Sequence, residues 1–206
     1  MVSRNLPNYL SSVRIVLSPA FLVTFFLPIW SGHFAVLSVV LCWVFMFLMD
    51  ISDILDGYTA RKLRLVSDFG KMFDPYTDLF ARLTYFLCFA GIGRMPVWML
   101  AIIIYREISV TFMRTVMMGR GFAMGARLGG KIKEWVYAFS AIFSMLALTL
   151  ERTGIWSEYS RLLWNIAMVF YVLSAIFAVI TFFDYLIFLN KKNKERIDKG
   201  AGKGIC

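Results

Sequence analysis

The chain has 206 residues, of which 60% are hydrophobic and 17% are charged, and its mean hydropathy is +0.70. This composition excludes an ordinary soluble domain and is typical of a protein whose helices cross a membrane. In a soluble protein the formal net charge of +9 would suggest a nucleic-acid partner, but the sequence has no basic and aromatic recognition module. We therefore attribute the charge to cytoplasmic loops beside anionic lipid headgroups, and we expect no nucleic acid as a partner.

The apolar runs predict an all-α integral membrane protein with six transmembrane helices, since about 20 apolar residues are needed for each crossing. Short turns with glycine, proline or polar residues separate the runs. The predicted helices span residues 9–30, 34–58, 72–92, 96–118, 131–150 and 160–189. We expect them to form one domain over residues 1–190, which would hold any catalytic site, and a basic tail follows over residues 191–206.

The distribution of lysine and arginine predicts the orientation in the membrane. Bases gather between the second and third helices, between the fourth and fifth helices, and in the tail. The three other turns hold only Arg94, Arg152 and Arg161. Because basic segments stay in the cytoplasm, we expect a multi-pass protein of the inner membrane with both termini, and the charged segment at residues 52–78, facing the cytoplasm.

That segment contains four aspartates at helical spacing. Asp53 and Asp56 lie near the end of the second predicted helix, and Asp74 and Asp78 lie near the start of the third. Spacings of three and four residues put each pair on one helical face. The two helices run antiparallel with a short link, so the four carboxylates converge. Their mutual repulsion favours a bound divalent cation, and an all-oxygen site suits Mg²⁺, Mn²⁺ or Ca²⁺ rather than zinc.

An alternative is that these acids pair with the neighbouring bases Arg61, Lys62, Arg64 and Lys71. We favour a metal and phosphate site because small residues accompany the acids. Gly57 and Gly70 allow a ligand to approach the backbone, and Ala60 lies one turn from Asp56. Arg61 and Arg64 add a counter-charge for phosphate.

The whole pattern reads D-x2-D-G-x2-A-R-x8-G-x3-D-x3-D from residue 53 to residue 78, and it resembles the complete signature of the CDP-alcohol phosphotransferases. The resemblance implies a six-helix membrane enzyme, usually a homodimer, that transfers a substituted phosphoryl group from a CDP-linked donor to an alcohol and releases CMP. It implies two divalent cations, Mg²⁺ or Mn²⁺, with Asp78 also acting as the general base. The implied metal ligands are Asp53, Asp56, Asp74 and Asp78.

Two further segments resemble the bacterial phosphatidylglycerophosphate synthases of this family. They are "NLPNYLSSVR" from residue 5 and "YREISVTFMRTVMMGRGFAMGARLGGKIK" from residue 105. The resemblance implies CDP-diacylglycerol as the lipid donor and glycerol 3-phosphate as the acceptor. It implies a nucleotide site formed by Asn8, Ser11, Gly57, Ala60, Arg61 and Gly70.

An anionic acceptor also agrees with the bases in the second half of the chain. Arg106 and Arg114 lie near one face of the fourth predicted helix, and Lys131 and Lys133 open the fifth. They are candidates for an acceptor-phosphate pocket. The alternatives are bases at the cytoplasmic margin of the membrane and, for Arg106, a structural pair with Glu107.

One departure leaves the acceptor open. Where the synthases usually read "DPLADK", this chain reads "DPYTDL" over residues 74–79, so that Leu79 replaces a base. Arg82, one turn beyond Asp78, is a candidate for the missing charge. The alternative function is the same reaction type with inositol phosphate or serine as acceptor, or with CDP-choline and diacylglycerol.

Two other classes of protein fit the sequence less well. A cation transporter would place acids near the middle of the membrane and often has inverted repeats, whereas the acids here lie at one helix end. A scaffold related to the enzymes would be expected to lose one of the four aspartates.

Overall fold

The computed structural model describes residues 6–63, 68–119 and 128–201. Side chains at 6–10, 56–63, 68–72, 118, 128–129, 131 and 191–201 lie outside that description. Six α-helices and one short 3-10 helix make up the described chain, so the prediction of a six-helix, all-α protein is confirmed. The elements are α1 (Leu6–Ser31), α2 (Ala35–Leu63), α3 (Asp68–Gly91), α4 (Val97–Gly119), α5 (Leu128–Thr153), η1 (Ser157–Tyr159) and α6 (Ser160–Ala201).

Four stretches of the described chain are long and apolar enough to cross a membrane: Ser11–Ser31, Ala35–Leu55, Ile132–Thr153 and Ser157–Asn190. The helices α3 and α4 have charged residues near their middles, Asp78 and Arg82 in α3 and Arg106 and Glu107 in α4, and these interrupt their apolar runs. The protein is therefore a multi-pass membrane protein, and its orientation stays a prediction.

Glycine ends three of the helices on the same side of the bundle. Gly32, Gly93 and Gly154 have φ values of 71°, 74° and 72°, a conformation that glycine adopts without strain. The amide of Gly32 donates to the carbonyl of Pro28 at 3.0 Å, and that of Gly154 donates to Leu150 at 3.1 Å. These bonds satisfy carbonyls that the helix ends would otherwise leave unpaired.

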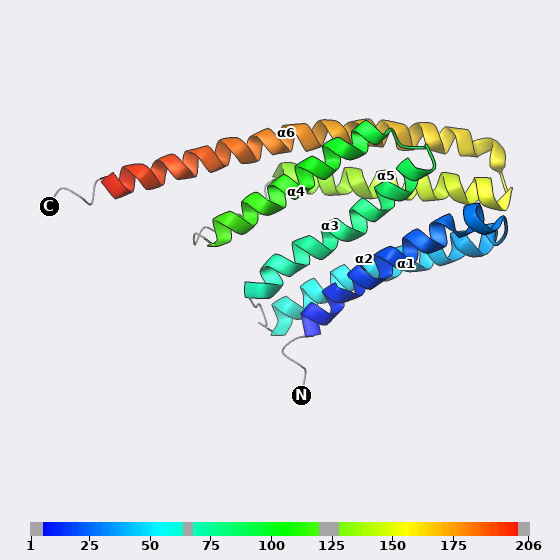
Figure 1. Ribbon diagram of the computed structural model, residues 1–206, viewed down its shortest axis with the longest axis horizontal. Helices are drawn as coiled ribbons and strands as arrows, with labels where there is room; N and C mark the ends of the chain where they lie inside the picture. The colour runs from blue at the N-terminus through cyan, green and yellow to red at the C-terminus, as the bar shows by residue number, and fades with distance from the viewer. Residues whose placement is uncertain (1–5, 64–67, 120–127, 202–206) are drawn as a thin grey trace.

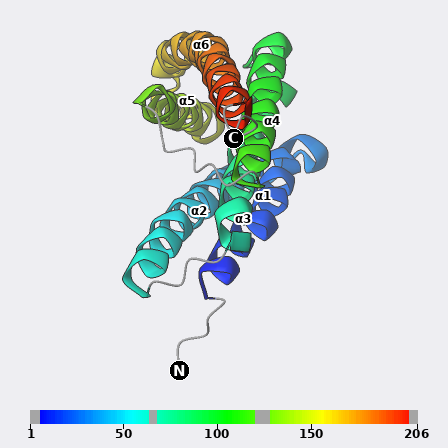
Figure 2. The same cartoon turned by 90° about the vertical axis from the view of Figure 1, so that its left-hand side faces the viewer.

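The six helices form two groups of three, as Figures 1 and 2 show. In one group α1 packs against both α2 and α3, and in the other α6 packs against both α4 and α5. Contacts of α2 with α5 and of α3 with α4 and α5 join the two groups. Helices α2 and α3 of the first group therefore face α5 of the second group.

Helix α6 is longer than predicted. It continues to Ala201, past the predicted end at residue 189, and its C-terminal part extends beyond the other helices in Figure 1. Residues 190–199 contain lysine, glutamate and arginine and no glycine or proline, so nothing in this stretch opposes a helix. The predicted basic tail therefore begins as a continuation of α6.

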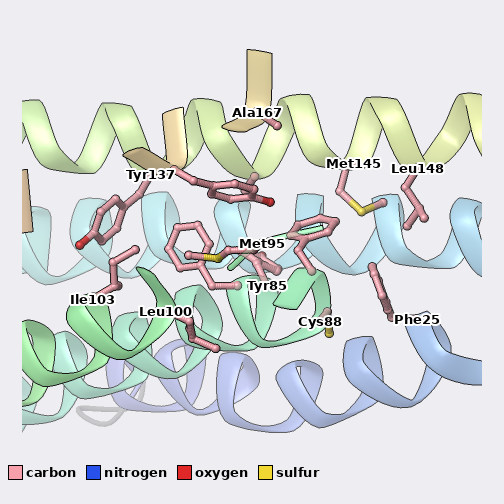
Figure 3. Packing of buried hydrophobic residues seen from close by; sticks show 14 of the residues in the cluster. Phe25, Tyr85, Cys88, Met95, Leu100, Ile103, Tyr137, Met145, Leu148 and Ala167 are labelled. Carbon is pink, nitrogen blue, oxygen red and sulfur yellow. The ribbon is translucent and has the colours of Figure 1, made fainter. Parts of the chain in front are cut away.

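Aromatic side chains fill the space where the two groups meet. Figure 3 shows Tyr137 of α5 pointing into this space, toward the helices that carry Tyr85 and Phe25. Phe86 of α3 is 1% exposed and makes edge-to-face contacts with Tyr137 at 5.3 Å and with Tyr171 of α6 at 6.1 Å between ring centroids. Because lipid is as apolar as the core, close packing of this kind holds such helices together.

Polar contacts tie the bundle together at the opposite end from the charged segment. Arg152 of α5 donates to the carbonyl of Phe25 at 2.8 Å and to the Ser38 hydroxyl at 2.6 Å. Beside it, Glu151 accepts bonds from Arg94 at 2.5 Å and from the indole of Trp164 at 2.8 Å. This end therefore joins α5 to α1 and α2 through Arg152, and to α6 and the turn between α3 and α4 through Glu151.

Truncation of the central aromatic should loosen the contact between the two groups. Phe86→Ala should lower the free energy of unfolding by on the order of 3 kcal/mol, since it leaves a cavity among Tyr137 and Tyr171. Leu87→Ala is the matched control, because Leu87 is 47% exposed on the same helix. Thermal unfolding in detergent measures both; equal melting temperatures for the two variants would contradict this account of the core.

Candidate active site

Three of the four predicted acids meet at one end of the bundle. Asp53 comes from the last third of α2, and Asp74 and Asp78 come from the first half of α3. Each offers a carboxylate oxygen that lies within 4.8 Å of the others. Their side chains are 51%, 44% and 24% exposed, so the cluster opens to solvent on one side. Asp56 lies in the same turn region of α2, but its side chain is outside the described set.

Arg14 of α1 lies between these carboxylates. Its side chain is only 2% exposed, and its guanidinium contacts Asp53 at 3.2 Å, Asp74 at 2.8 Å and Asp78. A buried charge is costly unless it is paired, and here a single planar group with several N–H donors serves three carboxylates. Arg14 therefore fixes α1 against the ends of α2 and α3.

Ser11, one turn before Arg14, approaches the same cluster, with its hydroxyl 3.4 Å from an oxygen of Asp74. Ser11 is the predicted nucleotide residue whose side chain the structure describes. The other residues predicted to bind the nucleotide lie in stretches whose side chains are outside the described set. Their roles stay predictions: Asn8, Gly57, Ala60, Arg61 and Gly70.

A cleft of about 290 Å³ opens beside the carboxylates, between α2, α3 and α5. Arg14, Asp50, Asp53 and Asp78 line its polar part. Its remaining walls are largely apolar: Met46, Met49, Phe86, Ala138, Ala141 and Ile142. The cleft thus offers acids to a polar group and apolar walls to a lipid-like one.

A smaller pocket of about 110 Å³ lies on the other side of Asp78, between α3, α4 and α5. It collects four bases, Arg82, Arg106, Arg114 and Lys133. We call it the basic pocket. The structure therefore brings together the three predicted acceptor-site residues whose side chains it describes, next to Asp78. The side chain of Lys131 lies outside the described set.

Two of these bases are also paired inside the protein. Glu107 is buried and accepts bonds from Arg106 at 2.9 Å and from Lys133 at 2.5 Å. The Arg106 guanidinium also donates to Thr181 of α6 at 3.1 Å. The pair of Arg106 with Glu107 that the sequence suggested as an alternative is thus present, and Arg106 lines the basic pocket as well. Arg114 donates to the hydroxyl of Tyr185.

Arg82 and Glu134 stand between the cleft and the basic pocket and line both. Arg82 is 3.7 Å from an oxygen of Asp78 and pairs with Glu134 of α5. Glu134 in turn lies 3.3 Å from the ammonium of Lys133. Asp78, Arg82 and Glu134 therefore form the boundary between the cleft and the basic pocket.

No role for Arg14 or Glu134 was predicted from the sequence. Arg14 appeared there only within a segment that resembles related enzymes. The signal that indicates its importance is a charged residue inside an apolar helix, which is rare in membrane proteins without a partner. For Glu134 the sequence gives no comparable signal, because its partner Arg82 lies on another helix.

The carboxylate cluster suits a hard divalent cation. All of its donor atoms are oxygens, and three residues supply them at positions within 4.8 Å of one another, which are the ligands that a hard cation prefers. Mg²⁺ and Mn²⁺ prefer such ligands, whereas zinc in proteins is usually bound with nitrogen or sulfur. Together with cations for a phosphate and a cleft for a lipid, the site has the parts that transfer of a phosphate-linked group requires.

A family model for CDP-alcohol phosphatidyltransferases matches residues 4–183. The chain therefore belongs to the CDP-alcohol phosphatidyltransferase family and is an enzyme of that class.

Among curated proteins, the chain is 32% identical over 192 residues to the CDP-diacylglycerol–glycerol-3-phosphate 3-phosphatidyltransferase of Treponema pallidum (strain Nichols), covering 88% of this chain and 87% of that protein. It is 32% identical over 166 residues to the enzyme of the same name from Bacillus subtilis (strain 168), covering 74% and 86%. It is 32% identical over 145 residues to a probable phosphatidylglycerophosphate synthase of Mycobacterium tuberculosis (strain H37Rv), covering 70% and 68%.

Removal of Arg14 should make the thermal stability of the protein depend on a divalent cation. Arg14→Ala leaves three carboxylates without their shared partner, so the melting temperature in EDTA should fall by about 5 °C or more. Added Mn²⁺ should then raise the melting temperature of this variant more than that of the wild type, because the cation replaces the lost charge.

Arg161→Ala serves as the control, since Arg161 is exposed at the other end of the bundle. An equal Mn²⁺-induced shift in wild type and Arg14→Ala would contradict the role given to Arg14.

Proposed function

We propose that this enzyme transfers the phosphatidyl group of CDP-diacylglycerol to glycerol 3-phosphate, releasing CMP and forming phosphatidylglycerophosphate. The observation that carries the proposal is that Asp78 lines both the cleft and the basic pocket. A carboxylate at that boundary is within reach of a lipid donor on one side and an anionic alcohol on the other. The printed names of the Treponema pallidum and Bacillus subtilis relatives support the same donor and acceptor.

The donor would lie with its diphosphate at the carboxylate cluster and its glycerol and acyl groups along the apolar walls of the cleft. The nucleotide would contact the small and polar residues of the signature and of the start of α1. We assign this role to Asn8, Ser11, Gly57, Ala60, Arg61 and Gly70. The small residues among them would let the nucleotide approach the backbone.

Two divalent cations, Mg²⁺ or Mn²⁺, would be held by Asp53, Asp56, Asp74 and Asp78. When bound, they supply positive charge that neutralises the diphosphate and stabilises the departing CMP. Arg14 shares three of these four carboxylates, and we propose that it keeps them oriented toward the cations.

Asp78 is proposed as the general base. It takes the proton of the acceptor hydroxyl as the oxygen forms a bond to the donor phosphorus, and the bond from that phosphorus to the CMP oxygen breaks. The proton passes to Asp78, and the electron pair leaves with CMP. Arg82 lies 3.7 Å from one oxygen of Asp78 and helps to hold it in this position.

The phosphate of the acceptor would bind among Arg106, Arg114, Lys131 and Lys133. Arg82 adds a further cation to this pocket. Leu79 also lines it, at the position where the synthases usually carry a base, and Arg82 from the next helical turn supplies a charge there. These neighbours support an anionic acceptor over a neutral one such as serine.

The site is proposed to face the cytoplasm, at the inner membrane, because the sequence between α2 and α3 is rich in lysine and arginine and the carboxylates lie toward the ends of α2 and α3 that it connects. A soluble nucleotide and a soluble phosphate can enter there while the diacylglycerol part of the donor stays in the lipid. We also propose a homodimer, as the family resemblance implies.

A panel of substrates tests the function. Purified enzyme with Mn²⁺ or Mg²⁺ would be given CDP-diacylglycerol with glycerol 3-phosphate, inositol phosphate, inositol or serine, and CDP-choline with diacylglycerol. CMP release follows the reaction. We expect release only with CDP-diacylglycerol and glycerol 3-phosphate; release with another pair instead would overturn the proposed acceptor or donor.

Replacement of the base should separate chemistry from binding. Asp78→Asn should reduce the rate of CMP release by at least a hundredfold, because general-base catalysis contributes about 10²–10⁴-fold. Binding of CDP-diacylglycerol, measured by titration, should change far less. Asp184→Asn in α6 is the control, and turnover near the wild-type rate in Asp78→Asn would contradict the general-base role.

A further inference from the structure

Glu134 is an accessible acid at the edge of a pocket that collects bases. Its side chain is 41% exposed, whereas that of Glu107, the other glutamate of the basic pocket, is 10% exposed. The carboxylate of Glu107 is therefore buried against Arg106 and Lys133, whereas that of Glu134 is accessible to a ligand. A carboxylate beside an incoming phosphate is unfavourable by charge alone, but it is a good hydrogen-bond acceptor for a hydroxyl elsewhere on the same ligand.

The contacts of Glu134 hold its side chain in place without using all the hydrogen bonds that its carboxylate can accept. One oxygen pairs with Arg82 of α3, and the other lies 3.3 Å from the ammonium of Lys133. These two cations offset its charge and restrict its rotamer. Since a carboxylate can accept about four hydrogen bonds, it can still accept one from a ligand hydroxyl.

The position of Glu134 relates it to the middle of the acceptor. The acceptor's phosphate would lie among the bases of the basic pocket, and its reacting hydroxyl would lie at Asp78. Glu134 lines both the cleft and the basic pocket, as Asp78 does. Glu134 is therefore placed to contact the carbon atoms that connect hydroxyl and phosphate, and in glycerol 3-phosphate the central one of these carbons carries a second hydroxyl.

We infer that Glu134 accepts a hydrogen bond from the hydroxyl next to the reacting one, and that it thereby selects polyol phosphates over acceptors that lack this hydroxyl. The inference rests on the proposed function, because it assumes an acceptor that bridges Asp78 and the basic pocket. Glu134 is on this account a specificity-determining residue for the acceptor.

A pair of acceptors that differ by one hydroxyl tests this role. The value of kcat/KM from CMP release would be measured for glycerol 3-phosphate and for 3-hydroxypropyl phosphate, which lacks the central hydroxyl. In the wild type we expect glycerol 3-phosphate to be preferred by about tenfold or more, the usual effect of a hydrogen bond to a charged group. In Glu134→Ala the ratio should fall to near one.

Two further variants guard against a purely structural effect. Glu134→Gln keeps the shape and a neutral acceptor oxygen, so its ratio should lie between those of the wild type and Glu134→Ala. Glu151→Ala removes another paired glutamate of α5 at the opposite end and should keep the wild-type ratio. Because the ratio compares two acceptors on the same sample, a smaller folded fraction does not change it.

The outcomes separate this inference from the proposed function. A wild-type ratio near one, or a wild-type ratio retained in Glu134→Ala, overturns the role of Glu134 while CMP release with glycerol 3-phosphate still supports the reaction. CMP release with neither acceptor overturns both.

Discussion

The arrangement of this protein depends on one buried guanidinium among three carboxylates. Arg14 is almost inaccessible, yet it reaches Asp53, Asp74 and Asp78 from a different helix. Neither side of this contact is stable alone, since an unpaired buried cation is costly and three carboxylates so close together repel one another. The contact therefore fixes the mutual position of α1, α2 and α3, and with it the open end of the cleft. The apolar and aromatic contacts elsewhere fill the space that this arrangement leaves.

From this cluster a series of alternating charges runs across the molecule. Asp78 is followed by Arg82, Glu134, Lys133, Glu107 and Arg106, each near the next. The series passes from α3 through α5 to α4, and Thr181 of α6 closes it. Each charge is offset by its neighbours, which permits so many charged groups inside a membrane protein. The same series separates the cleft, which suits a lipid, from the basic pocket, which suits an anion, and Asp78 lines both.

The sequence predicted the elements of this site better than its connections. Apolar run lengths predicted six helices, and the spacing of Asp53, Asp74 and Asp78 predicted their convergence, because both follow from helical periodicity and a short link. The importance of Arg14 and the pairing of Arg82 with Glu134 depend on contacts between helices distant in sequence, which no local pattern encodes. The length of α6 was underestimated because loss of hydropathy at residue 190 marks the end of a membrane span and not the end of a helix. The roles of Asp56, Arg61 and Lys131 stay predictions.

The central claim is that the carboxylates around Arg14 hold the cations that the reaction requires. Anomalous diffraction from crystals of the enzyme grown with Mn²⁺ tests this most directly, since it locates the metal without reference to activity. The account predicts an anomalous peak bounded by the carboxylates of Asp53, Asp74 and Asp78, and its loss in crystals of Asp74→Asn. Bound Mn²⁺ at another place in the protein, with none at these three residues, would contradict it.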